Sequence, residues 1–273
     1  MVYLMLLACG AFSGFLAGLL GIGGGFVVVP VLHLLLPMLN VDPALVPTVS
    51  VATSLAAMVP TAMSAVLAQH RKRSLRAEWV WLLGPGVAFG SALGSLGAAS
   101  IDGVWITLIF AVYATLFALK LLLAPAPSPV VPAAAPLPQR WVAALPQWSV
   151  AVFIGGFAAL AGVGGASLVM PYLLMRQAEI RQASAASSAV GLVVAIVGAT
   201  GFGMARATQF TGAQGGLIGF VYWPAALAIG AAAIFLAPLG VAAAHRLPVG
   251  HLRQGFAALL LVVALVAALK ILA

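Results

Sequence analysis

Two glycine clusters set in apolar sequence are the first candidates for a functional site in this chain. The first reads LLGIGGGFVVVP over residues 19–30, and the second reads AGVGGASLVMP over residues 161–171. Glycine lowers helix stability by about 1 kcal/mol relative to alanine, so each cluster is expected to break a helix. The short helix that begins after a break exposes backbone N–H groups and the positive end of its dipole. The two clusters therefore predict anion binding by backbone groups.

Hydroxyl residues follow both glycine clusters at matching positions. They occur in PTVSVATS, residues 47–54, and in SAASS, residues 184–188. Hydroxyls in such helices either bond their own helix and its neighbours or line a polar site, and both interpretations stay open. The candidate substrate-binding residues combine glycines of both breaks with nearby hydroxyls: Gly21, Gly23, Gly24, Gly25, Thr53, Ser54, Gly162, Gly164, Gly165, Ser167, Ser187 and Ser188.

Acidic residues are scarce, which limits the ions that the chain could carry. The four carboxylates, all at expected loops or helix ends, are Asp42, Glu78, Asp102 and Glu179. A carboxylate inside the membrane is the usual carrier of a proton or sodium ion and the usual partner of a cationic substrate. Cation transport is therefore disfavoured. His33 is the histidine within an apolar segment and the candidate proton carrier, with a buried neutral histidine as the other interpretation.

The residue types expected within the membrane do not favour an enzyme. One cysteine, no membrane carboxylate and one histidine in an apolar segment supply neither a nucleophile with its base nor a cluster of metal ligands. We therefore expect no enzyme activity, no catalytic residue, no metal site and no cofactor.

The composition is that of an integral membrane protein. Hydrophobic residues make up 64% of the 273, charged residues 6%, and the mean hydropathy is +1.20. Apolar runs of 20 or more residues without regular alternation indicate helices rather than a β-barrel. The net charge of +8 comes from basic residues between the apolar runs, so it indicates topology and not nucleic-acid binding. The fold class predicted is all-α, in a polytopic membrane protein.

The apolar blocks repeat, which indicates an internal duplication. They fall near residues 3–36, 44–68, 79–99 and 103–123, and again near 147–175, 184–203, 215–243 and 254–272. Between the two sets lies APAPSPVVPAAAPLP, whose prolines exclude a helix. We predict a first transmembrane repeat over residues 1–123, a Pro/Ala-rich linker over 124–145 and a second repeat over 146–273.

The basic residues predict that the second repeat is inverted relative to the first. Cytoplasmic loops collect Lys and Arg, so the basic loop 70–78 and the linker 124–145 are both expected in the cytoplasm. This orientation requires the chain to reverse at each glycine cluster, giving about five helical segments per half. The short segments near 26–36 and 166–175 are below the roughly 20 residues of a full span, which favours re-entry, and spanning stays the alternative. Inverted repeats of this kind are typical of secondary transporters.

Glycines at every fourth position predict close helix packing. They are Gly10, Gly14 and Gly18 in the first half, and Gly86, Gly90 and Gly94 further along. Such faces join helices within one chain or between two copies. A homo-oligomer is therefore one expectation.

The sequence also resembles a known family, the sulfite exporter TauE/SafE permeases. The resemblance rests on GFLAGLLGIGGGFVVVPVL and GGFAALAGVGGASLVMPYL, on the ATS and ASS that follow them, and on the basic HRKR loop. It implies that the first conserved segment falls on Gly21, Gly23, Gly24, Gly25 and Pro30, and its second copy on Gly162, Gly164, Gly165 and Pro171. The chain departs from symmetry at Ala166 and Ser167, where the first copy has Gly25 and Phe26.

The resemblance implies a bacterial inner-membrane transporter of small sulfur-containing anions. We expect sulfite, sulfoacetate or another organosulfonate as the substrate, and export as the direction. Uptake of an organosulfonate or other small oxyanion with proton coupling through His33 is the alternative. The expected partners are the small anion and the lipid bilayer, with no nucleic acid.

Overall fold

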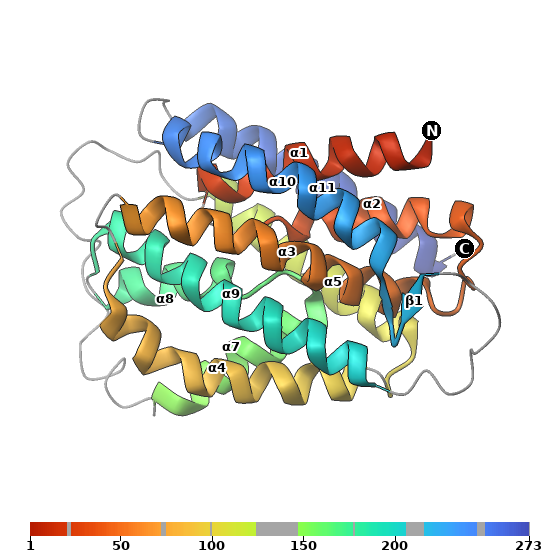
Figure 1. The fold of residues 1–273 in the computed structure, drawn as a ribbon, viewed down its shortest axis with the longest axis horizontal. Helices are drawn as coiled ribbons and strands as arrows, with labels where there is room; N and C mark the ends of the chain where they lie inside the picture. The colour runs from red at the N-terminus through yellow and green to blue at the C-terminus, as the bar shows by residue number, and fades with distance from the viewer. Residues whose placement is uncertain are drawn as a thin grey trace.

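A computed structural model describes residues 1–20, 23–71, 75–98, 100–123, 147–176, 178–205, 216–244 and 249–272. These residues form long helices that lie roughly along one direction (Figure 1). Six of the described helices are long and apolar enough to cross a membrane. The predicted all-α polytopic fold is confirmed. The linker 124–145 lies outside the described residues, so the predicted boundaries of the two repeats stay a prediction.

The described residues of the first half form five α-helices, with the glycine cluster between the first two. Their bounds are α1 Val2–Leu20, α2 Gly25–Leu35, α3 Val46–Arg71, α4 Ala77–Ala98 and α5 Gly103–Leu123. A short 3-10 helix, η1, covers Pro37–Leu39 after α2. The helix α2 has 11 residues, too few to span a bilayer at 1.5 Å per residue.

The second half repeats this order of long and short helices. Its α-helices are α7 Gln147–Ala161, α8 Ala166–Met175, α9 Ile180–Met204, α10 Trp223–Ala244 and α11 Val249–Leu272. The predicted apolar block 215–243 differs from the structure at its start. A hairpin of β1 Leu217–Ile218 and β2 Val221–Tyr222 precedes α10, with Gly219 in its turn at φ 60°. A two-residue strand is too short to give an alternating pattern, so the sequence showed only a continuous apolar run.

Each half packs its first helix against a helix of the other half, and both contacts are lined by glycines. α1 packs along α10, and α7 packs along α4. At the first contact Gly10, Gly14 and Gly18 lie against Ile229, Ala233 and Ala237, respectively. At the second, the glycines at 86, 90 and 94 lie against α7 in the same increasing order. Both pairs are therefore parallel, and both glycine faces are used within the chain.

The centre of the molecule is the crossing of α3 and α9 (Figure 1). Leu55 lies near Gly198, whereas Gln69, further along α3, lies near Ser184, at the start of α9, so these two helices are antiparallel. α3 also runs parallel to α10, because Pro60 meets Gly230 and the Ser64 hydroxyl donates to the carbonyl of Ile234.

These contacts establish the inverted repeat. α1, α3 and α10 run one way, and α4, α7 and α9 run the other. α1, α3 and α4 of the first half are therefore antiparallel to their counterparts α7, α9 and α10 in the second half. This is the arrangement that five segments per half require.

Basic positions gather at one end of the helix array. α3 ends there at Arg71, Arg76 directly precedes α4, and Arg176 is the C-cap of α8. Because α9 is antiparallel to α3, Arg181 in its first turn belongs to the same end. We refer to this end, at the left of Figure 1, as the basic end.

Candidate functional site

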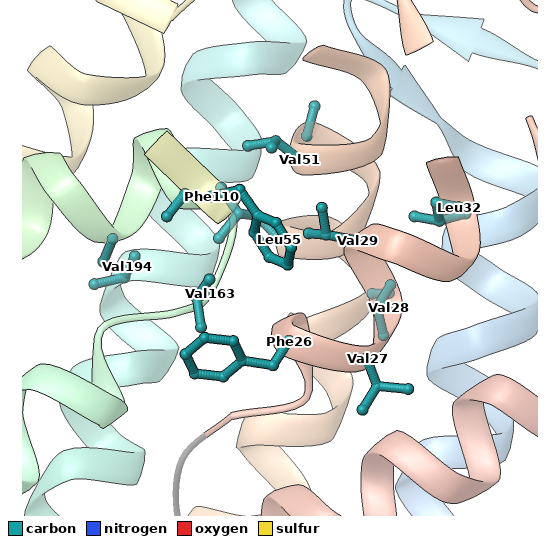
Figure 2. Packing of buried hydrophobic residues seen from close by; sticks show 14 of the residues in the cluster. Phe26, Val27, Val28, Val29, Leu32, Val51, Leu55, Phe110, Val163 and Val194 are labelled. Carbon is teal, nitrogen blue, oxygen red and sulfur yellow. The ribbon is translucent and has the colours of Figure 1, made fainter. Parts of the chain in front are cut away.

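The two glycine breaks lie against one another at the α3 and α9 crossing. A Cβ on Gly25 would overlap the carbonyl oxygen of Gly162 and would lie 2.8 Å from the Cα of Val163. Figure 2 shows Phe26, in the first turn of α2, beside Val163 from the segment that joins α7 to α8. The backbone of one break thus packs directly on the backbone of the other, which only glycine permits at position 25.

The second break also needs glycine for its backbone conformation. Gly164 and Gly165 have φ values of 73° and 61°, in the left-handed region that a residue with a Cβ rarely adopts. Gly165 is the N-cap of α8, and Gly24 is the N-cap of α2. In neither case does a side chain cap the helix, and the carbonyls of Gly24, Gly164 and Gly165 accept hydrogen bonds from first-turn N–H groups instead.

A small cavity lies between the two helix N-termini. Its volume is about 20 Å³, room for about one water molecule. Its lining comes from both halves: Ala17, Gly23, Gly24, Met58, Thr61, Ala62, Ala65, Gly164, Ala166, Ser188 and Gly191. The cavity therefore brings together four candidate residues, namely Gly23, Gly24, Gly164 and Ser188. None of the lining residues carries a charge.

Met58 limits the size of this cavity. Its Cε is the nearest atom to a Cβ built on Gly23, at 2.8 Å, and it would overlap a Cβ built on Gly164. The side chain thus lies between Gly23 and Gly164. Because methionine is unbranched and flexible, it is the group that could move aside to enlarge the cavity.

Two candidate hydroxyls on α3 are engaged by the second half of the chain. The Ser54 hydroxyl donates to the carbonyl oxygen of Gly162 at 3.0 Å, and both groups are buried. The Thr53 hydroxyl accepts a hydrogen bond of 3.0 Å from the backbone N–H of Tyr222 in the hairpin. These hydroxyls satisfy backbone groups of the break and of the hairpin, and they position both against α3.

Ser167 is likewise engaged by a partner outside the break. Its hydroxyl hydrogen-bonds the phenol of Tyr113 from α5. The ring of Tyr113 stacks on Phe26 with centroids 5.3 Å apart. Phe26 and Ser167 occupy equivalent places in the two repeats, so one tyrosine contacts the first turn of both short helices.

The two candidate serines of α9, Ser187 and Ser188, lie one helical turn before Gly191, which lines the cavity. The hydroxyls of Ser187 and Ser188 each donate to the carbonyl of Ser184 at 2.9 Å. Ser188 also accepts a hydrogen bond of 3.4 Å from the side-chain amide of Gln69. Of this pair, Ser188 lines the cavity.

Two candidates remain, Gly21 and His33. Gly21 lies outside the described residues. His33, in the last turn of α2, lines a different cavity of about 180 Å³ between α2, α3, α5 and α11. That cavity is almost wholly apolar, with His33 and Thr107 as the polar residues in its lining.

None of the four carboxylates lines the cavity between the two breaks. Asp42 and Asp102 lie in connections between helices, Glu78 lies in the first turn of α4 and Glu179 is the N-cap of α9. These four are all the acidic residues of the chain. The nearest fixed charges along α3 are instead the basic ones that follow Gln69. The site therefore has the electrostatic character that favours an anion.

The chain matches the family described as "Sulfite exporter TauE/SafE" over residues 6–267. The chain belongs to this family. Its glycine breaks, inverted repeat and helical membrane fold are thus those of a transporter and not of an enzyme. No solved structure matches the chain significantly.

Curated relatives of this TauE/SafE member carry names of the same kind. One is a "Probable membrane transporter protein" of Haemophilus influenzae, 31% identical over 96% of both chains. Another is the "Probable membrane transporter protein YunE" of Bacillus subtilis, 25% identical over 64% of this chain and 68% of that protein. Both names agree with a multi-pass membrane transporter.

Sequence reasoning missed several residues of this TauE/SafE site. Met58, Thr61 and Ala65 line the cavity on the same face of α3 as Ser54, at spacings of four, seven and eleven residues. That spacing is the helical repeat, so extending the face of Ser54 along the helix would have found them. Tyr113 and Gln69 are different, because their partners lie 54 and more than 110 residues away in the sequence.

Proposed function

We propose that this TauE/SafE member exports a small sulfur oxyanion across the bacterial inner membrane. Sulfite, sulfoacetate or another organosulfonate is the proposed substrate, and the basic end is the proposed cytoplasmic side. The observation that carries the proposal is the cavity between the N-termini of α2 and α8, at the contact of the two halves. Inverted-repeat transporters typically place their substrate at such a contact.

The cavity supports an anion for three physical reasons. Two helix N-termini, at Gly24 and at Gly165, direct the positive ends of their dipoles toward it. The hydroxyls of Thr61 and Ser188 lie in its lining, and oxyanions accept hydrogen bonds from such groups. The lining contains no carboxylate to repel an anion or to stabilise a cation. Neutral donors also bind an anion weakly enough to let it leave.

The driving force for export is the membrane potential. With the cell interior negative, each monovalent anion that leaves gains about 2.3 kcal/mol per 100 mV. Export therefore needs no coupled cation, in keeping with four carboxylates that all lie at helix ends or connections. The cytoplasmic assignment of the basic end follows from the enrichment of Lys and Arg in cytoplasmic loops.

The substrate class is testable with purified protein in liposomes. We expect efflux of sulfite and radiolabelled sulfoacetate, and no movement of rubidium or choline under the same voltage. The matched variants are Gly24→Leu and Gly165→Leu, which add side chains at the N-caps of α2 and α8, and Gly97→Leu at an exposed position of α4. The first two variants should lose at least 10-fold in flux and the third should not. Equal flux in all variants that insert normally would disprove the site.

A further inference from the structure

One face of α3 continues from the cavity toward the basic end. Thr61, Ala65 and Gln69 follow at intervals of four residues, and the first two line the cavity. Gln69 is buried, with 7% of its surface exposed, although it lies two residues before the end of the helix. A buried amide at that place must have partners within the protein.

The partners of Gln69 come from the facing helix of the other half. Its amide nitrogen lies 3.4 Å from the hydroxyl of Ser184 and 3.4 Å from the hydroxyl of Ser188. Ser188 belongs both to this contact and to the cavity lining. The Gln69 side chain therefore lies directly between the cavity and the basic end.

The opposite end of the α3 and α9 crossing is closed by backbone. The Tyr222 N–H donates to Thr53 at 3.0 Å, and the Phe220 N–H donates to the carbonyl of Phe202 at 3.2 Å. A Cβ on Gly219 would lie 2.5 Å from the carbonyl oxygens of Phe202 and Gly203, so the hairpin turn packs tightly on the end of α9. Opening this end requires displacement of a hairpin.

The contact of Gln69 with α9 and the contact of the hairpin with α3 and α9 differ in the movement that would open each end. At the Gln69 end, two hydrogen bonds at 3.4 Å are longer than the usual 2.9–3.0 Å for an N–H donor, so both are weak. A rotation of one side chain breaks them. The Gln69 end is therefore the side from which the cavity is reached with the smaller rearrangement.

From this difference we propose that Gln69 is the specificity-determining gate between the cavity and the basic end. This inference rests on the proposed function, since it names the residue that admits the anion to the same site. The anion oxygens replace the serine hydroxyls as acceptors of the Gln69 N–H groups, and the serine hydroxyls turn to donate to the anion. Every group at the gate then remains hydrogen-bonded during passage.

The first test measures access without measuring transport. In a Cys9→Ala background, which removes the one native cysteine, we compare Gln69→Cys with Leu67→Cys. Leu67 is 54% exposed on the neighbouring face of α3, so it serves as the lipid-facing control. The probes are the methanethiosulfonate reagents that carry a sulfonate or a trimethylammonium group. We expect the thiol introduced at position 69 to react at least 5-fold faster with the sulfonate reagent, and the thiol at 67 to react with neither.

The second test separates a gate from a structural hydrogen bond. Gln69→Glu keeps the shape of the side chain but places a negative charge in the path of the anion. Flux through this variant should fall at least 10-fold at pH 8 and recover as the pH is lowered and the introduced carboxyl becomes neutral. A structural hydrogen bond would be lost and regained with the same protonation, because only the neutral carboxyl can donate to the serines. The unfolding temperature is therefore measured over the same pH range, and a flux that falls only where the unfolding temperature falls would overturn the gate.

The outcomes distinguish the gate from the proposed function. Sulfonate flux in a protein whose thiol at position 69 stays unreactive would overturn the gate and leave the proposed function in place. Preferential reaction with the sulfonate reagent, in a protein that moves neither sulfite nor a sulfonate, would support an anion gate and overturn the substrate assignment. Equal reaction with both reagents would overturn an anion-selective path past position 69.

Discussion

The Ser54 hydroxyl donates a hydrogen bond of 3.0 Å to the carbonyl oxygen of Gly162, so the long central helix of the first half holds the glycine break of the second. The bond is buried and joins residues 108 positions apart. Leaving a buried carbonyl without its donor costs about 1–3 kcal/mol. The hydroxyl therefore stabilises a backbone shape that glycine alone would leave free.

Replacing Ser54 by alanine should lower the free energy of unfolding by about 1–3 kcal/mol, because the Gly162 carbonyl loses its donor. The measurement is thermal unfolding in detergent, with Thr200→Ala as the control. The Thr200 hydroxyl bonds only to carbonyls of its own helix, so its removal should change the unfolding temperature little. Equal shifts for the two variants would show that the contact does not stabilise the break.

Replacing Gly25 by alanine should destabilise the protein by about 1–3 kcal/mol, since the added methyl group overlaps the Gly162 carbonyl. Gly97→Ala is the matched control, because nothing lies within 4 Å of a Cβ at that position in α4. Alanine is the better helix former, so the control should be neutral or slightly stabilising. A tolerated Gly25→Ala would mean that the two breaks do not pack backbone to backbone.

Replacing Met58 by alanine should enlarge the cavity and favour larger substrates. We expect the ratio of sulfoacetate flux to sulfite flux to rise at least 3-fold, because the Cε of Met58 lies between Gly23 and Gly164. Met63→Ala serves as the control, since Met63 is 47% exposed on the outer face of the same helix. An unchanged ratio would remove Met58 from the site.

Replacing His33 by glutamine should leave the pH dependence of transport unchanged. His33 lines the apolar cavity between α2 and α5 and not the cavity at the breaks. The measurement is flux at a fixed voltage between pH 5.5 and 8. Loss of a pH-dependent component in the variant would instead favour the proton-coupled uptake predicted from the sequence as the alternative.

Local sequence patterns were enough to predict the helix order. The glycine clusters broke the helices where expected, since α2 starts at Gly25 and α8 at Ala166. The inverted orientation followed from the basic residues, because loop charge and the number of segments per half constrain each other. The swapped packing of α1 on α10 could not be predicted, because a glycine every fourth residue shows that a close partner exists but not which one.

The partners of the candidate hydroxyls could not be predicted for a similar reason. Thr53, Ser54 and Ser167 each bond a group more than 50 residues away, and nothing in the local pattern identifies that group. Gln69 was missed because an amide beside a basic loop is usually exposed. Its burial results from the approach of α9, which the fold alone determines.

The measurement that tests the central claim most directly is voltage-driven flux in proteoliposomes. Purified protein is sealed with sulfite or a radiolabelled sulfonate inside, a potassium gradient with valinomycin sets the potential in either sense, and the pH gradient is held at zero. The account predicts that efflux follows the imposed voltage, increasing when the interior is negative and falling when it is positive. Flux that ignores the voltage and stops without a proton gradient would contradict an anion exporter driven by the membrane potential.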